Sequence, residues 1–327
     1  MRKSCLHILL LIALPLLLSV SGCFPNKATR STAYFGPTES LAQVASAINA
    51  NNSQLPTLWA RIGYFEADVR DQRGGKSQFV NGSGGYLMAR GAEAFQALAE
   101  WKDKNGQTHE MPEDNGPIVQ RHPQEIRLRA SKAGIGTVMD VGANNDNVWL
   151  VAPPADKAWW ARRKNIGKPC MDAMPIDPLA VMEVLGISGI GDDFVQPPFP
   201  VMRFNNDRDA YMMIWESQST DSPKRWLARR EVWYDRQSKL PELVNLFDEN
   251  GRIVVSAYLS QHKQVAGTTA KIATRFQLLF PDTDSHFTFT LDDVKLNNGS
   301  FPNDRSFLFN PAHTGVNNVQ QMDGNCP

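Results

Sequence analysis

Cysteine is scarce in this sequence, with four residues among 327, and no two of them form a C-x-x-C pair. This excludes a disulfide framework, a zinc ribbon and a thioredoxin-like redox site. Charge of one sign is not in excess either, because 34 Lys and Arg balance 34 Asp and Glu without a long run of either sign. We therefore expect no binding to nucleic acid. With 42% hydrophobic residues, the chain is instead long and apolar enough for a globular fold.

Motifs of common enzymes are also missing. The six His residues form no H-E-x-x-H motif, and neither Ser83 nor Ser188 completes G-x-S-x-G. The Gly-Ile-Gly segments at 134–136 and 189–191 lack the third glycine of a dinucleotide fingerprint. The acidic pairs at 192–193 and 292–293 are chain neighbours, which a strand would point to opposite faces. We therefore expect no catalytic residue, no metal site and no cofactor.

Long apolar runs are absent except at the beginning of the chain. Arg2 and Lys3 precede an apolar run over 6–20 that is too short for a comfortable membrane span and has the layout of a secretory signal. The run ends in Val20-Ser21-Gly22-Cys23, which resembles the bacterial lipobox, in which the Cys thiol is acylated and becomes the first mature residue. The alternative is an ordinary signal peptide with a coincidental Cys. Since residue 24 is Phe rather than Asp, the segment resembles an outer-membrane signal.

These features divide the chain into three parts. Residues 1–22 are the predicted lipoprotein signal peptide, and 23–38, which are polar and show no apolar period, are a lipidated tether. Residues 39–327 are predicted to form a single domain. Its 91–118 segment breaks the strand pattern, with helix formers up to Trp101 and loop residues after it, and is expected to be an insertion.

The two Cys residues of the mature domain are candidates for a disulfide. In an exported protein, Cys170 and Cys326 are expected to pair, which would fasten the C-terminus to the middle of the chain. The alternative is that Cys326 lies in a frayed tail and does not meet Cys170.

Two helices are predicted. Ser40 and Gln43 fit a capping box, and the apolar spacing that follows predicts an amphipathic helix over 40–50, ended by asparagines. Asp177 is a good N-cap, Pro178 suits the first helical position and Gly186 the stop, which predicts a helix between them. The following segment, 186–200, is rich in Gly and Pro yet apolar, so we expect an apolar loop.

Most of the remaining chain reads as strands. Apolar and polar residues alternate at 276–280 and 287–292, so each strand should have one apolar face. A last strand is predicted at 306–309. No strand alternates with a helix in the βαβ manner, and a sheet of about eleven antiparallel strands has to curl. The sequence therefore predicts an α+β, mainly β fold, a curved antiparallel half-barrel (an unclosed β-barrel) with covering helices.

Several segments of the domain resemble the bacterial lipoprotein-localisation superfamily, which comprises a periplasmic carrier and an outer-membrane receptor (LolA/LolB-like). The segments that carry the resemblance are LPTLWAR at 55–61, GGYLMAR at 84–90, DVGANNDNVWL at 140–150, MPIDP at 174–178 leading into Leu185-Gly186, and LDDVKLN at 291–297 with Phe307 and Phe309. The resemblance implies an unclosed half-barrel with helices at its mouth that holds acyl chains in a hydrophobic cavity. The receptor is itself a lipoprotein, as this chain is predicted to be. The chain departs from the family by its greater length, at 91–118, 153–171 and 186–209.

The main functional hypothesis is a non-enzymatic lipoprotein that binds a lipid, an acyl chain or a lipoprotein. We expect it at the outer membrane facing the periplasm, as a monomer held by its lipid anchor, in envelope lipid or lipoprotein trafficking or sensing. The apolar loop would form the mouth of the cavity, and the residues expected to line it are Ile253, Val255, Phe276, Leu278, Phe287 and Phe289.

The alternative hypothesis is a structural envelope lipoprotein with a packed interior that docks a protein partner. The two hypotheses differ in whether aromatic side chains fill the concave face. The segment Trp159-Trp160 before the basic triplet at 162–164 likewise has two interpretations, a membrane-interface contact or a charged strand edge.

Overall fold

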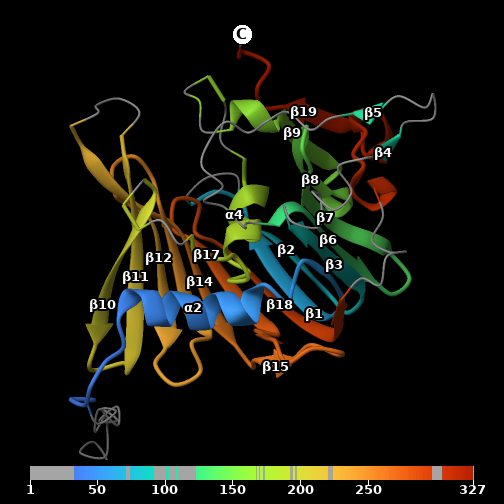
Figure 1. Ribbon diagram of the computed structural model, residues 1–327. Coiled ribbons are helices and arrows are strands. Elements are labelled where there is room, and N and C mark those ends of the chain that lie inside the picture. The colour runs from blue at the N-terminus through green and yellow to red at the C-terminus, as the bar shows by residue number, and fades with distance from the viewer. Residues whose placement is uncertain are drawn as a thin grey trace, which may run out of the picture. The chain divides into compact units, whose positions relative to one another are not determined.

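Figure 1 shows the computed structural model of the chain. It describes residues 33–70, 74–91, 101–102, 108–109, 123–166, 168, 170–171, 174–191, 194–195, 197–219, 224–296 and 304–326. The chain forms two compact units, Met1–Pro37 with Asn205–Asp209, and Thr38–Phe204 with Ala210–Pro327. In the first unit the amide of Tyr34 donates to the carbonyl of Asn206 over 3.2 Å. The second unit carries the sheet and both helices.

A 15-stranded sheet dominates the second unit, in the order β10-β11-β12-β13-β14-β17-β18-β1-β3-β6-β7-β8-β9-β19, with β2 pairing on β1. The strands are β1 (Thr57–Val69), β2 (Gln78–Gly82), β3 (Gly85–Gly91), β6 (Pro123–Lys132), β7 (Gly136–Ala143), β8 (Asn147–Ala152), β9 (Lys157–Arg162), β10 (Phe199–Asn205), β11 (Ala210–Gln218), β12 (Trp226–Asp235), β13 (Pro241–Phe247), β14 (Ile253–Ser260), β17 (Arg275–Phe280), β18 (Ser285–Leu296) and β19 (Asn318–Gln321). Two small sheets pair β4 (Trp101–Lys102) with β5 (Thr108–His109), and β15 (Lys263–Gln264) with β16 (Lys271–Ile272).

The large sheet is two meanders joined along one ladder. The first half of the chain supplies β1 to β9, the second half supplies β10 to β18, and the central pair β1–β18 connects them. Every described ladder is antiparallel except that of β19 with β9. The sheet curves strongly, and its terminal strands, β10 and β19, are at opposite ends of the strand order, so the sheet does not close (Figure 1). The predicted fold class, a curved unclosed antiparallel sheet with few helices, is confirmed.

Both predicted helices form where their caps are. Helix α2 (Leu41–Asn52) begins after a capping box in which the amide of Gln43 donates to Ser40 Oγ and the amide of Ser40 donates to Gln43 Oε1. Helix α4 (Pro178–Glu183) begins after Asp177, whose carboxylate accepts from the amide of Leu179 over 2.9 Å. No helix in the described ranges has the length and apolar character needed to cross a lipid bilayer.

The strand count exceeds the prediction of about eleven because short pieces join the sheet. β10 occupies the end of the expected apolar loop, and β19 lies in a tail for which no strand is predicted. The predicted strand at 306–309 is wrong, because the chain there forms a 3-10 helix, η4 (Asp304–Phe307), followed by extended residues. The alternate apolar residues of the 306–309 segment are buried or stacked against other residues. Phe307 is 1% exposed, and the ring of Phe309 stacks on that of Trp149 at 4.9 Å. They pack on a sheet face instead of joining a ladder.

In the predicted insertion at 91–118, the structure describes Gly91, β4 and β5. Trp101, expected at the end of a helix, begins β4. The helix predicted before it, at 92–100, lies outside the described residues, as do Cys23 and the signal peptide.

The C-terminal segment covers a second face of β7 to β9. Trp149, Val151 and Ala158 form a small core there with Phe309 and Val316, separate from the main core, to which Val148 and Leu150 belong. The remaining connections in this region are η2 (Pro153–Ala155), η3 (Arg163–Asn165) and η5 (Pro311–His313). This explains why β8 is apolar on both sides, since each side has its own core.

A disulfide and a buried carboxylate fasten the end of this segment. The predicted disulfide forms between Cys170 and Cys326, whose Cα atoms are 5.1 Å apart. Next to it, the Asp323 carboxylate is fully buried and accepts hydrogen bonds from Asn165 at 2.6 Å, Arg162 at 2.9 Å and Gln321 at 2.9 Å. Burial opposes ionisation of Asp323, but these hydrogen bonds outweigh it and lower its pKa to about 2. The C-terminus is therefore fixed to the middle of the chain.

Candidate functional site

The concave face of the sheet carries the main core. Alternate residues of β17 and β18 are buried, while those between them are partly or fully exposed. The buried residues are Phe276, Leu278, Phe280, Ser285, Phe287, Phe289 and Leu291. Phe276 and Phe289 face each other across the ladder with stacked rings 4.7 Å apart, and Phe287 lies 5.1 Å from Phe289. The alternation of apolar and polar residues expected from the sequence therefore corresponds to one buried face of β17 and β18.

Five of the six expected lining residues share this face. Phe276, Leu278, Phe287 and Phe289 are 0% exposed and Val255 is 2% exposed. Ile253 does not join them, because a register shift separates it from Val255 on the ladder with β13, and its side chain is 38% exposed. We call the five buried residues the floor of the concave face.

Apolar residues extend from this floor across seven of the 15 strands of the sheet. One row of directly paired residues runs over seven strands from β11 to β1, and a second, shorter row runs beside it. The first row is Met213, Val232, Val244, Ala257, Leu278, Phe287 and Ala67, and the second is Trp215, Arg230, Leu246 and Val255. We call these the long row and the short row. With ~4.8 Å between neighbouring strands, the long row extends over roughly 29 Å from its first residue to its last.

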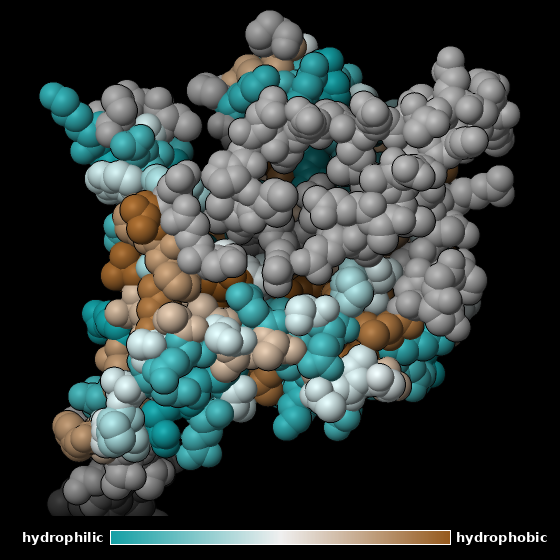
Figure 2. Space-filling model, in the orientation of Figure 1, coloured by the Kyte–Doolittle hydropathy of each residue, from teal (hydrophilic) through white to brown (hydrophobic). Residues whose placement is uncertain are grey.

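Helix α2 lies across the floor (Figure 1). It turns Val44, Ala45 and Ile48 inward, each at most 3% exposed, while its outer surface is largely hydrophilic or neutral (Figure 2). With 12 residues at ~1.5 Å each, α2 is about 18 Å long, which is shorter than the long row.

Amide side chains near the end of α2 hold the segment after α4 in place. Asn49 donates to the carbonyl of Ile190 and accepts from its amide, both over 2.7 Å. Asn52 donates to the carbonyl of Ser188 over 2.8 Å. This explains why the helix continues to Asn52 although the asparagines were expected to end it: their side chains bond to a neighbouring segment rather than to the helix backbone.

The same end of α2 is bonded to β16 on its other side. Asn51 donates to the carbonyl of Lys271 over 3.0 Å and accepts from its amide over 2.8 Å. Helix α2, the 186–190 segment and the β15–β16 hairpin are thus connected by side chains that the sequence shows as a run of asparagines. We call these three pieces the cover.

The expected mouth, 186–200, is divided in two. Its first part belongs to the cover, with Ile187 and Ile190 at 7% and 2% exposed. Gly186 at φ +70° makes the turn out of α4, where a Cβ atom would lie 2.6 Å from Pro241. Further on, Val195 is 83% exposed.

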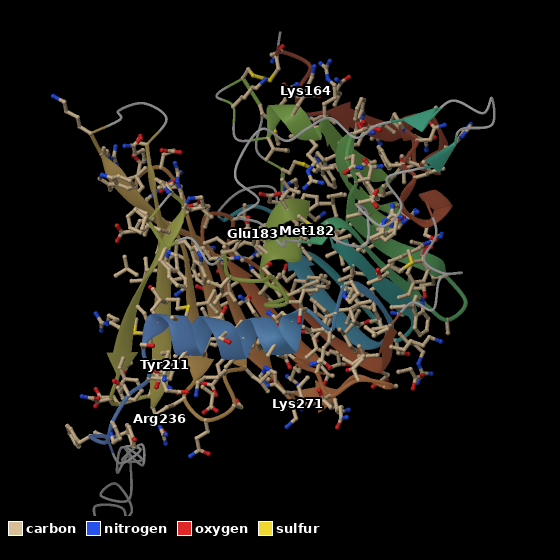
Figure 3. The ribbon with its side chains drawn as sticks, viewed as in Figure 1. Lys164, Met182, Glu183, Tyr211, Arg236 and Lys271 are labelled. Carbon is tan, nitrogen blue, oxygen red and sulfur yellow. A yellow bond between two sulfur atoms is a disulfide. The ribbon has the colours of Figure 1, made fainter. Side chains whose placement is uncertain are left out.

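A group of polar side chains interrupts the apolar surface on the β12 side. Arg230 and Tyr234 point to the concave face with Val232 between them, and are 7% and 3% exposed. The Arg230 guanidinium lies over the ring of Trp215, its partner on β11, 4.0 Å from the ring centre. Glu183, partly buried at the end of α4, interacts electrostatically with Arg230. In Figure 3 Glu183 lies on the side of α4 toward β12.

The surroundings of this group disfavour negative charge on its own members. Burial raises the pKa of Glu183 above its usual value, against the opposing effect of Arg230 and with a further rise from Asp177. Burial also raises the pKa of Tyr234 to about 12 and that of the capping residue Asp177 above its usual value. Arg230 is therefore the main charge on this part of the face.

Sequence reasoning missed this group. In the strand 226–235, Arg230 stands in the run Arg229-Arg230-Glu231 and looks like a solvated charge, although it has the same parity as Val232 and Tyr234. The alternation along β12, which puts Arg230 on the same face as Val232 and Tyr234, is the signal that could have shown that Arg230 is buried.

The Trp159-Trp160 segment and the basic residues after it make contacts within the protein. Trp159 is 7% exposed, and the ring of Trp160 lies 6.4 Å from that of Phe309. Arg162 pairs with Asp323, and Arg163 donates to the carbonyl of Asn144 over 3.0 Å. β9 is not the edge of the sheet, because β19 pairs with it.

Comparisons with known proteins give structural resemblances only. No protein-family model matches the chain, and no curated protein matches it in sequence. Among solved structures, a DUF1329 family protein from Desulfovibrio piger is 12% identical with a TM-score of 0.43, over 82% of this chain and 97% of that one. An outer membrane lipoprotein-sorting protein domain from Vibrio parahaemolyticus is 11% identical with a TM-score of 0.44, over 81% and 95%.

A LolA superfamily protein from Nitrosomonas europaea is 10% identical with a TM-score of 0.41, over 83% of this chain and 99% of that one. At these identities and TM-scores, the resemblance assigns no role to any residue of this chain. The structural neighbours of the chain thus include DUF1329 and LolA-superfamily proteins, and the sequence motifs resemble the second of these groups.

Proposed function

We propose that this protein is a non-enzymatic lipoprotein of the bacterial envelope that holds a hydrophobic ligand on the concave face of its sheet. The observation that supports the proposal is the continuous apolar long row, whose residues are at most 3% exposed and which extends further than the length of α2. A lipid or acyl chain binds by burial of apolar area, at ~0.8 kcal/mol per CH₂ group. With the cover displaced, a row roughly 29 Å long can bury many such groups.

In this proposal the cover and the floor have different tasks. Val255, Phe276, Leu278, Phe287 and Phe289 form the floor under the ligand. Because the floor is enclosed, a ligand that reaches Phe276 or Phe289 has to displace the cover. The acylated Cys23 anchors the domain, as a monomer, to the outer membrane facing the periplasm, and the carried molecule is a lipid, an acyl chain or a lipidated protein.

The experiment is mass spectrometry of the mature protein carrying Cys23→Ser, expressed in a bacterial periplasm, under native and denaturing conditions with lipid extraction. A lipid that co-purifies in stoichiometric amount, or uptake of added palmitate, supports the proposal. An apo mass without uptake of palmitate contradicts it. The unaltered protein tests the anchor, since its mature mass should include the acyl groups on Cys23.

A second candidate function is a scaffold lipoprotein that docks an envelope partner. The observation that favours it is the complete burial of Phe276, Phe287 and Phe289, whose rings fill the centre of the face. An apo mass without uptake would favour this function.

A further inference from the structure

Arg230 is a buried cation for which the described residues supply little compensation. Its side chain is 7% exposed, and a guanidinium carries five N–H donors. Among the described residues, it has no hydrogen-bond or ion-pair partner for these donors, and its contact is with the face of the Trp215 ring. Buried charges in proteins are usually paired, because an unpaired buried charge is costly.

Glu183 does not form an ion pair with this cation. The Glu183 carboxyl group, at the end of α4, interacts electrostatically with Arg230, but no ion pair joins them in the described part of the chain, and burial raises the pKa of Glu183. Tyr234, two positions along the same face, presents a hydroxyl that likewise has no hydrogen-bond partner among the described residues. The site therefore offers a guanidinium group and a hydroxyl group, which can donate hydrogen bonds, and a carboxyl group that donates one when it is protonated.

Apolar rows lead away from this donor group. Arg230 belongs to the short row, between Trp215 and Leu246, and Val255 follows two strands away. Val232, next on the same face of β12, belongs to the long row, which continues to Phe287. A molecule with an anionic end at Arg230 can thus extend its apolar part along the rows toward the floor.

We propose that Arg230, together with Tyr234 and Glu183, binds the anionic group of an amphiphile, a carboxylate or a phosphate, whose apolar chain lies along the rows. This proposal rests on the proposed function and adds the chemical class of the ligand. The guanidinium supplies the charge-assisted hydrogen bonds, the Tyr234 hydroxyl adds a donor, Glu183 adds another when it is protonated, and the Trp215 ring holds the guanidinium in place.

The test measures the affinity of the full mature chain, carrying Cys23→Ser, for three probes: palmitate, dimyristoyl phosphatidylglycerol and the uncharged cetyl alcohol. Hydrogen bonds to a charged group should make at least one anionic probe bind about tenfold or more tightly than the alcohol. Preference for palmitate identifies a carboxylate ligand, and preference for the phospholipid identifies a phosphate ligand.

Variants assign the preference to the site. Arg230→Gln should bind the anionic probe no more tightly than the alcohol. The matched control is Arg229→Gln, because Arg229 is the next residue, lies on the other face of β12 and pairs with Glu249. It should keep the preference. Circular dichroism and the melting temperature establish that each variant folds.

Two results separate failure of this proposal from failure of the proposed function. If the wild-type chain binds cetyl alcohol as tightly as both anionic probes, the anion site is wrong and the hydrophobic site stands. Such a result needs no variant, so it holds even if Arg230→Gln does not fold. If none of the three probes binds, the proposed function fails, and the anion site with it. Loss of the preference in Arg229→Gln but not in Arg230→Gln would also overturn the assignment.

Discussion

Replacement of Phe289 by alanine tests the packing of the concave floor. Phe289 is 0% exposed, stacks on Phe276 at 4.7 Å and contacts Phe287 at 5.1 Å. Removing a buried Phe side chain costs about 3–5 kcal/mol, and a lost aromatic pair adds about 1 kcal/mol. We expect the free energy of unfolding of Phe289→Ala to fall by about 5 kcal/mol, a large part of the stability of a typical domain.

Urea unfolding, followed by circular dichroism, measures this change. The control is Thr288→Ala, the adjacent residue, which points to the other face of β18 and is partly exposed. Its loss should stay below about 1 kcal/mol. A loss in Phe289→Ala as small as that of Thr288→Ala, with an unchanged dependence on urea, would refute the assignment of Phe289 to a packed floor.

The charged variant tests the function of the same position. Phe289→Asp should abolish ligand retention, because a carboxylate in the floor opposes an apolar ligand. Unchanged retention together with unchanged stability would remove Phe289 from both the ligand site and the core. Phe289→Leu, which keeps an apolar side chain, should keep more of the retention than Phe289→Asp and separates a charge effect from loss of the ring.

Three further predictions concern the ends of the sheet and the cover. Reduction of the Cys170–Cys326 bond, which spans 156 residues, should lower the free energy of unfolding by about 5 kcal/mol in the chain-entropy model; an unchanged urea midpoint under dithiothreitol would contradict it. Because the pKa of Asp323 is lowered to about 2, its stabilisation is present above its unfolded pKa near 4 and is lost as the pH falls from there through about 2. Asp323→Asn should therefore be destabilised by roughly 2 kcal/mol at pH 7 and flatten the acid limb of the pH–stability curve; an unaltered acid limb would speak against the assignment. Asn49→Ala should cost about 1–3 kcal/mol, because it leaves the backbone of Ile190 without two hydrogen bonds, and should speed hydrogen exchange at the Ile190 amide; unchanged protection there would show that the cover is held otherwise.

The sequence predicts the fold best where local rules and tertiary packing agree. In β17 and β18 the period-two alternation coincides with one buried face, so the floor residues follow from the pattern. The caps at Ser40 and Asp177 place both helices for the same reason, because their partners lie within three residues along the chain.

The rest depends on contacts between distant segments. Phe307 and Phe309 carry a strand-like alternation, but their partners are Arg90 and Trp149 on another part of the chain. Arg230 is hidden in a charged run, and its burial depends on contacts with other segments, such as Trp215 of β11, which β12 alone does not encode. The asparagines of α2 look like helix breakers until the segment that they hold is known.

The pairing of β19 with β9 joins segments that lie far apart in the sequence. β19 pairs with β9, and the amide of Met322 donates to the carbonyl of Trp160 over 2.8 Å. Since the entropic cost of closing a loop rises with the number of residues that it encloses, this ladder should be among the slower contacts to form. The disulfide between Cys170 and Cys326 lies beside this ladder and keeps the two segments close together once it has formed.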